Sequence, residues 1–228
     1  VTEIGWRAFE SCTGLTSVVI PDSVTEIGEY AFIGCTGLTS IVIPSSVTKI
    51  GKCAFEGCTG LTSIVVAEGN EVYDSRNNCN AIIETSSNTL IRGCQNTVVP
   101  DTVTEIEWHA FESCSGLTSV VIPDSVKKIE NNAFEGCSRL TSIVVSEGNK
   151  VYDSRNNCNA VIETSRDRMI KGCQNTVIPD TVTSIESYAF ENCSGLTNIA
   201  IPNTVNFINS FQFMGCTGLT SVVIPTSV

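Results

Sequence analysis

Apolar and polar positions along this chain recur with a 23-residue period. Repeating units begin at a series of valines, and five of the seven units share this length: Val1, Val24, Val47, Val103, Val126, Val182 and Val205. In one copy, residues 38–43 read Leu-Thr-Ser-Ile-Val-Ile, and Pro44 follows. Alternation of this kind is typical of a short strand, and proline cannot donate a ladder hydrogen bond. We expect one strand per unit, with Ile41 and Ile43 facing the core and Ser40 and Val42 facing outward.

A second pattern lies in the first half of each unit. Ile27, Ala31, Phe32 and Cys35 are separated by four, five and eight residues, spacings that favour one or two turns of α- or 3₁₀-helix facing the same core. Gly37 and its copies then stand where a helix end commonly needs a left-handed residue. One unit has Arg139 instead, so we expect a strained positive φ there, costing on the order of 1 kcal/mol.

Two units, residues 47–102 and 126–181, are more than twice as long as the others, and each carries an extra segment. The segment Glu68–Thr102 recurs almost unchanged as Glu147–Thr181. The chain therefore also repeats in larger blocks, at the constant offset that relates Val24 to Val103 and Val103 to Val182. We expect each extra segment to add one longer turn, from which residues 80–85 and 89–94 project as a hairpin.

No single unit can bury its apolar side chains alone, so the copies must stack into a solenoid. Residues 1–228 are therefore predicted to form a single domain, with like positions such as Leu15, Leu38 and Leu61 side by side. Successive strands would pair as a parallel sheet, which we expect on the concave face.

The motifs at Ile20–Ile41 and Tyr73–Thr85, the latter repeated at Tyr152–Thr164, resemble those of the BspA-like leucine-rich repeats. These repeats occur on secreted and surface proteins of bacteria and of some parasitic protists. The resemblance implies a right-handed leucine-rich-repeat solenoid of the α/β class, with short helical or 3₁₀ segments on its convex face. It also implies a secreted or cell-surface location and a binding role, and it carries over no catalytic residue. Asn209 and Gln212 replace the usual glycine and alanine, so the last turn should be less regular.

Composition narrows the classes of partner. The net charge of −11, from 13 basic and 24 acidic residues, repels phosphate backbones, so we expect no nucleic-acid partner. No apolar run approaches the roughly 20 residues that a membrane helix needs. The chain begins at Val1 without a methionine or a secretory leader, so we expect a fragment or a processed chain of a longer protein.

The outward strand positions supply the candidate binding residues. A valine recurs just before each Ile-Pro position, and a serine recurs two residues earlier, so that stacked copies would form two rows. An exposed apolar row is typical of partner surfaces, although valine also simply suits strands, and both readings stay open. The predicted contact residues for a protein or glycan are Ser17, Val19, Ser40, Val42, Ser63, Val65, Val98, Ser119, Val121, Ser142, Val144, Val177, Asn198, Ala200, Ser221 and Val223.

Seven of the twelve cysteines share one repeat position and are predicted to be buried free thiols. Cys79 with Cys94, and Cys158 with Cys173, each flank a predicted hairpin at the same separation, and are candidate disulfides, with free thiols as the alternative. No C-x-x-C pair or other metal motif occurs, so we predict no metal and no cofactor. His109, the only histidine, is predicted to be a surface residue.

Two functions fit these patterns. The first is a non-enzymatic binding module, because no acid, base and nucleophile are brought together. The second is a structural spacer or stalk that associates with itself through the open ends of the solenoid.

Overall fold

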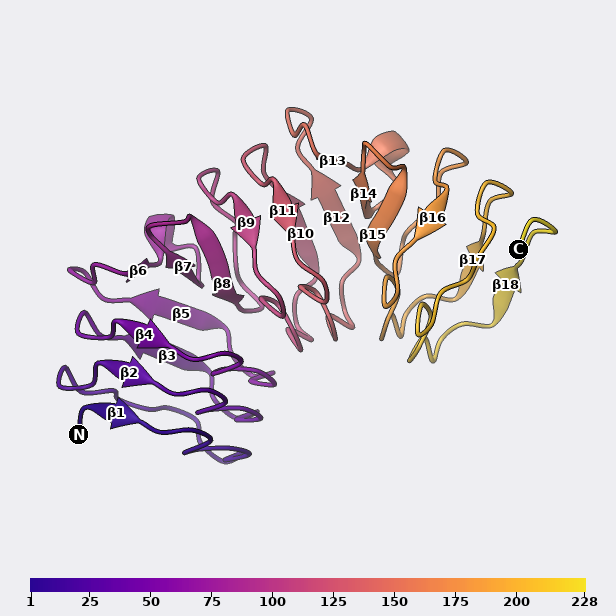
Figure 1. Cartoon of the computed structure of the whole chain (residues 1–228). Coiled ribbons are helices and arrows are strands. Elements are labelled where there is room, and N and C mark those ends of the chain that lie inside the picture. The colour runs from indigo at the N-terminus through magenta and orange to yellow at the C-terminus, as the bar shows by residue number, and fades with distance from the viewer.

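Each unit makes one turn of a solenoid, because its apolar side chains are buried only against the copies in neighbouring turns. The computed structural model describes residues 1–228 and stacks these turns into an arc, with the two termini at opposite ends (Figure 1). The fold is a β-solenoid of stacked parallel strands.

The turns between the first and the last carry two strand positions rather than the single one that was predicted, whereas the first turn lacks the second strand and the last turn lacks the first. The first is a two-residue strand at the Thr-x-Ile motif: β1 (Glu3–Ile4), β2 (Glu26–Ile27), β4 (Lys49–Ile50), β9 (Glu105–Ile106), β11 (Lys128–Ile129) and β16 (Ser184–Ile185). These strands pair in parallel and in register, with Ile4 beside Ile27 and Ile27 beside Ile50. The sheets therefore form between like positions of successive units.

The second position is the strand that the alternation predicted, and the prediction is confirmed. Its copies are β3 (Ser40–Ile43), β5 (Ser63–Val66), β10 (Ser119–Ile122), β12 (Ser142–Val145), β17 (Asn198–Ala200) and β18 (Ser221–Val223). In β3, Ile41 and Ile43 are buried whereas Ser40 and Val42 are exposed, as the period of two requires.

The expected helical segments, and with them the α/β class, are not confirmed. Residues 29–34 and 36–37 form turns, and the only helices are the three-residue 3₁₀ segments η1 (Arg76–Asn78) and η2 (Arg155–Asn157). Two residues four apart in each turn have positive φ, for example Tyr30 at 59° and Gly34 at 71°, which interrupts any right-handed helix. Backbone donors bond instead to the next turn, as from the Phe32 N–H to the Ala54 oxygen at 2.8 Å. Neither 3₁₀ segment is long enough to cross a membrane.

The left-handed conformation predicted at Gly37, and the strain predicted at Arg139, are both wrong, because neither residue has a positive φ. Position 37 requires a glycine for another reason. A Cβ on it would lie 2.4 Å from the carbonyl oxygen of Thr13 in the preceding turn, so the stacking of the backbone itself excludes a side chain there.

The predicted hairpin is present in both extra segments. In the first, β6 (Tyr73–Asp74), β7 (Ala81–Glu84) and β8 (Thr89–Gly93) are antiparallel, and in the second so are β13 (Tyr152–Asp153), β14 (Ala160–Glu163) and β15 (Arg168–Gly172). The hairpin does not project, however. Strand β8 pairs in parallel with β9 in a sheet of order β11-β9-β8-β7-β6, so the hairpin is a layer of the stack.

These layers divide both the outer strand ladder and the core. The second strand positions form three separate pairs, β3–β5, β10–β12 and β17–β18. The buried side chains likewise fall into three clusters. Leu38 and Leu61 belong to one cluster, with Leu15 packed against it, so the expected row of leucines is confirmed within a block.

The position of the sheet on the concave face is not confirmed. In Figure 1 the strands run between the inner and outer edges of the arc, so the sheets lie along its flanks and turns line its inner edge. The irregularity expected in the last turn is present: Asn209 and Gln212 both donate side-chain hydrogen bonds to the carbonyl oxygen of Ile185, at 2.6 Å.

Candidate functional site

The predicted contact residues form a surface that we call the serine–valine face, made of the outward side chains of β3, β5, β10, β12, β17 and β18 and their copies. In register, Ser40 lies beside Ser63 and Val42 beside Val65. Val42 remains 53% exposed although a copy stacks on it. The face therefore presents a regular row of apolar side chains to solvent. Burial in the core does not account for apolar residues at these exposed positions.

The hairpin layers break this face into segments. Val98 and Val177 lie at the breaks, outside any strand, and each is 72% exposed. The Val98 N–H bonds to the carbonyl oxygen of Cys79 at 3.0 Å rather than to a strand of the ladder. A partner would thus meet short two-stranded patches instead of one continuous sheet.

Each hairpin layer also creates a hollow on the molecule. The first hollow, about 500 Å³, is lined by Arg92, Trp108 and His109 among others. The second, about 360 Å³, has Lys171, Ser187 and Tyr188 at the equivalent positions of the next block. The hollows are therefore copies of one site whose polar residues have diverged.

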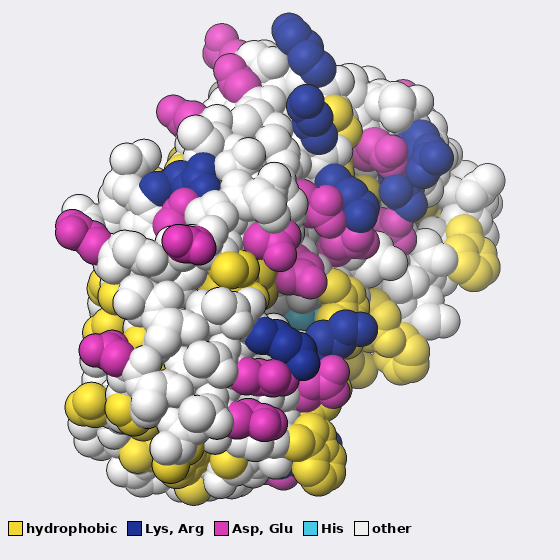
Figure 2. All heavy atoms as spheres, turned by 60° about the vertical axis from the view of Figure 1, so that its left-hand side comes forward, with side chains coloured by type: hydrophobic (Ala, Val, Ile, Leu, Met, Phe, Trp, Pro, Cys, Tyr) yellow, Lys and Arg dark blue, Asp and Glu magenta, His cyan; other side chains and the backbone are white.

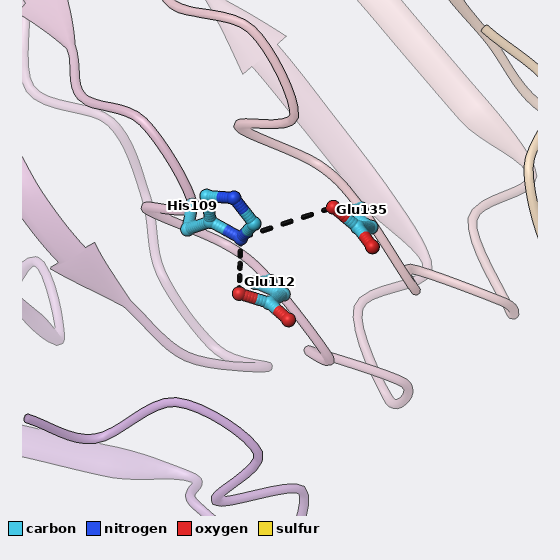
Figure 3. Close-up of side chains that lie close together, drawn as sticks. All are labelled: His109, Glu112 and Glu135. Atoms are coloured by element: carbon cyan, nitrogen blue, oxygen red, sulfur yellow. Dashed lines mark hydrogen bonds and ion pairs between the residues drawn. The ribbon is translucent and has the colours of Figure 1, made fainter. Parts of the chain in front are cut away.

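The side chain of His109 is only 12% exposed, so the prediction of a surface residue is wrong. Its Nδ1 is hydrogen-bonded to Oε2 of Glu112 and lies 3.8 Å from Oε2 of Glu135 (Figure 3). Burial lowers the pKa of His109, but the hydrogen bond and charge of Glu112 and the charge of Glu135 outweigh it and raise the pKa above its usual value. The Nε2 atom is buried without a partner.

His109 sits within a row of glutamates that we call the glutamate row, formed by the tenth residue of consecutive units: Glu56, Glu112, Glu135 and Glu191. Burial and the charge of Glu112 raise the pKa of Glu135, and burial and the charge of Glu135 raise that of Glu191. Glu191 is 3% exposed, and its Oε2 has no hydrogen-bond partner. Figure 2 shows the histidine in a hollow bordered by acidic, basic and hydrophobic side chains.

Two buried cations lie among these carboxylates. Arg92 donates to the carbonyl oxygens of His109 and Glu112, at 3.2 and 3.0 Å. Lys171 is also buried, and its charge lowers the pKa values of Glu135 and Glu191. They partly offset the acidic charge of the row.

Reasoning from the sequence missed the grouping of His109, Glu112 and Glu135. The signal is present in the period, because Glu112 and Glu135 are one repeat apart and His109 precedes Glu112 by three positions. Stacking at that offset brings all three together.

The candidate disulfides are not formed, because all twelve cysteines are free thiols. Cys79 packs in the middle core cluster and Cys94 in the first, while Cys158 packs in the last and Cys173 in the middle one. The members of each pair thus face opposite sides of their layer and cannot be bridged. Thiols at the shared repeat position donate to the preceding turn, as from Cys58 to the Phe32 oxygen at 3.1 Å.

The polar residues of the extra segments stabilise the local turns. Asn77, Asn78 and Asn80 all have positive φ, a conformation that asparagine tolerates well. Asp74 accepts hydrogen bonds from the Arg76 guanidinium at 2.6 to 3.0 Å, so its oxygens are engaged.

A family model for a BspA-type leucine-rich repeat region, in six copies, matches residues 1–89, 91–163 and 168–228. A solved structure of a leucine-rich cell surface protein from Faecalibacterium prausnitzii has a TM-score of 0.68 and 34% identity, over 98% of this chain and 57% of that one. No curated protein matches the chain.

Two further solved structures share the fold. The pneumococcal vaccine antigen PcpA has a TM-score of 0.59 at 20% identity, over 100% of this chain and 57% of that one. A leucine-rich repeat protein from Eubacterium ventriosum has a TM-score of 0.55 at 23% identity, over 89% and 60%. The chain thus spans less than two thirds of each of these three proteins.

Proposed function

Because this chain belongs to the BspA-type leucine-rich-repeat family, we propose that it is a non-enzymatic binding module of a secreted or cell-surface protein. In this proposal the serine–valine face contacts a protein or glycan. The observation that carries the proposal is that the valines of the paired strands stay exposed although they lie in register with copies, as Val121 does with Val144. The description of the F. prausnitzii relative as a cell surface protein supports the location.

The chemistry of the reactive groups supports a non-enzymatic role. The only histidine is bonded to a carboxylate, and no serine or cysteine is hydrogen-bonded to it. Burial raises the pKa of the Cys58 thiol to about 12 and that of Cys114 to about 11. Such thiols remain protonated at neutral pH and are poor nucleophiles.

The experiment is a binding screen of the purified chain against immobilised extracellular-matrix proteins and glycans. A triple variant, Val42→Lys, Val65→Lys and Val121→Lys, places three charges on the serine–valine face and should weaken binding to each hit by more than about tenfold. A control with Ser45→Lys, Asn203→Lys and Thr226→Lys adds the same charge at exposed turn positions and should bind normally.

The same preparation tests the alternative of a self-associating stalk. Light scattering across a range of concentrations should give a monomer with saturable binding. Concentration-dependent oligomers without any saturable ligand, or normal binding by the folded face variant, would reject the proposal.

A further inference from the structure

Three side chains with donor atoms suited to a metal ion converge between the two hollows, since His109 lines the first hollow and Glu135 lines the second. His109 Nδ1, one oxygen of Glu112 and one oxygen of Glu135 all lie within 4.8 Å of one another, and the two dashed contacts in Figure 3 both end on Nδ1. We propose that His109, Glu112 and Glu135 form a binding site for one divalent first-row transition-metal ion such as Zn²⁺. An imidazole nitrogen with carboxylate oxygens is a ligand set that these ions accept.

The separations fit such an ion after a small movement. Bonds of ~2.0–2.2 Å in a tetrahedron place ligand atoms roughly 3.3–3.6 Å apart. His109 Nδ1 and Glu135 Oε2 are 3.8 Å apart, slightly more than this ligand–ligand separation. Glu112 is in direct hydrogen-bonded contact with Nδ1, so its carboxylate has to move slightly away to admit the ion.

The charges around the cluster favour a cation. The glutamate row contributes four carboxylates, and the buried cations facing it are Arg92 and Lys171. With all these groups ionised and the histidine neutral, two negative charges remain uncompensated, which a divalent ion neutralises. The buried Glu191 oxygen that has no partner is a second sign that positive charge is lacking in this region.

The surrounding turns hold the three side chains in place. Glu112 and Glu135 belong to adjacent turns, joined by the hydrogen bond from the Phe111 N–H to the Ala133 oxygen at 2.7 Å. His109 has a positive φ of 59° and is braced by Arg92, which bonds to its carbonyl oxygen. Ligands on a rigid frame lose little freedom when the ion binds.

Only the middle block of the chain has this set. The corresponding residues one block earlier are Tyr30, Ile33 and Glu56, and one block later they are Tyr188, Glu191 and Met214. The fold therefore forms with other residues at these three positions, and it does not need the metal-ligand set of the middle block. The residues of the neighbouring blocks are also substitutions that the fold accepts.

In the experiment, the chelator-stripped chain is titrated with Co²⁺ while its absorption spectrum is followed. Calorimetry then measures the displacement of Co²⁺ by Zn²⁺. We expect one ion per chain and a spectrum without a thiolate charge-transfer band, which separates this site from the cysteines. His109→Tyr copies Tyr30 and Tyr188, and Glu135→Gln removes one ligand charge with little change of shape. Each should weaken binding by more than about tenfold, while circular dichroism reports the fold.

The matched control is Glu10→Gln, at the same repeat position but paired with Arg7 on the exposed first turn; it should bind Co²⁺ as the unaltered chain does. Absence of a one-to-one complex would overturn the proposal, and the cluster would then be a histidine–glutamate ion pair only. Equal binding by the folded His109→Tyr and Glu135→Gln chains, or a thiolate band that they retain, would overturn it as well.

Discussion

The ring of Phe111 lies against the backbone of Gly93, so closely that a Cβ on Gly93 would be 2.4 Å from its Cε1 atom. The Gly93 N–H donates to the Ala110 oxygen at 2.8 Å, the same bond that Phe9 makes to Ala31. Gly93 therefore occupies the phenylalanine position of its layer. Each hairpin layer ends the stack of rings in this way, since a Cβ on Gly172 would lie 2.3 Å from Cε1 of Phe190.

We expect Gly93→Ala to destabilise the chain by about 1–3 kcal/mol, because the added methyl group must displace a buried ring. Thermal unfolding measures the effect. Gly5→Ala is the control, since a Cβ there meets nothing within 4 Å. An equal change in the melting temperatures of the two variants would contradict the packing described here.

Phe32 stacks between two other rings, with centroids 5.1 Å from Phe9 and 5.4 Å from Phe55. Phe32→Ala should cost about 3–5 kcal/mol, because it opens a cavity in a fully buried stack. Phe9→Ala at the partly buried end of the stack should cost clearly less. Urea unfolding compares the two, and a larger loss for Phe9→Ala would be inconsistent with this core.

The thiols should differ sharply in reactivity. Cys12 is exposed, whereas Cys58, Cys114 and Cys193 are buried, and burial raises the pKa of each of these three to about 11 or 12. Iodoacetamide at pH 8 should label Cys12 first and the buried thiols only after unfolding. Mass mapping reads both states, and rapid native labelling of Cys114 would refute the prediction.

Asp153 makes part of the stability dependent on pH. Burial raises its pKa, but hydrogen bonds from Arg155, including one from Nε at 2.8 Å, outweigh this and lower the pKa. The stability it contributes is therefore present above the pKa of an unfolded-chain aspartate, about 3.9, and is lost as the pH falls through the lower folded value.

Asp153→Asn should lower the free energy of unfolding at pH 7 by on the order of 1 kcal/mol, and the difference from the unaltered chain should shrink below about pH 4. Urea unfolding at pH 7, 5 and 3 measures it, with the exposed Asp180→Asn as the control. A difference that stays constant down to pH 3 would show that the ion pair with Arg155 is not its source.

The repeat period by itself determined which positions are buried and which lie next to one another within a block. Ile41 beside Ile64, the exposed valines and the row of leucines all follow from one constant offset. The hairpins were also predictable, because alternation and a polar turn are local signals.

Only the tertiary structure decided the features that local pattern leaves open. Tyr30 and His109 adopt positive φ although neither is glycine. The Tyr30 N–H donates to the Lys52 oxygen of the next turn at 3.0 Å, and so the helical spacing yields turns. The hairpin could be placed as a layer only through its pairing with β9. Each hairpin layer changes the sequence separation between stacked neighbours, so a contact such as that of Gly93 with Phe111 cannot be obtained from the period. The two faces of the layer also separate Cys79 from Cys94.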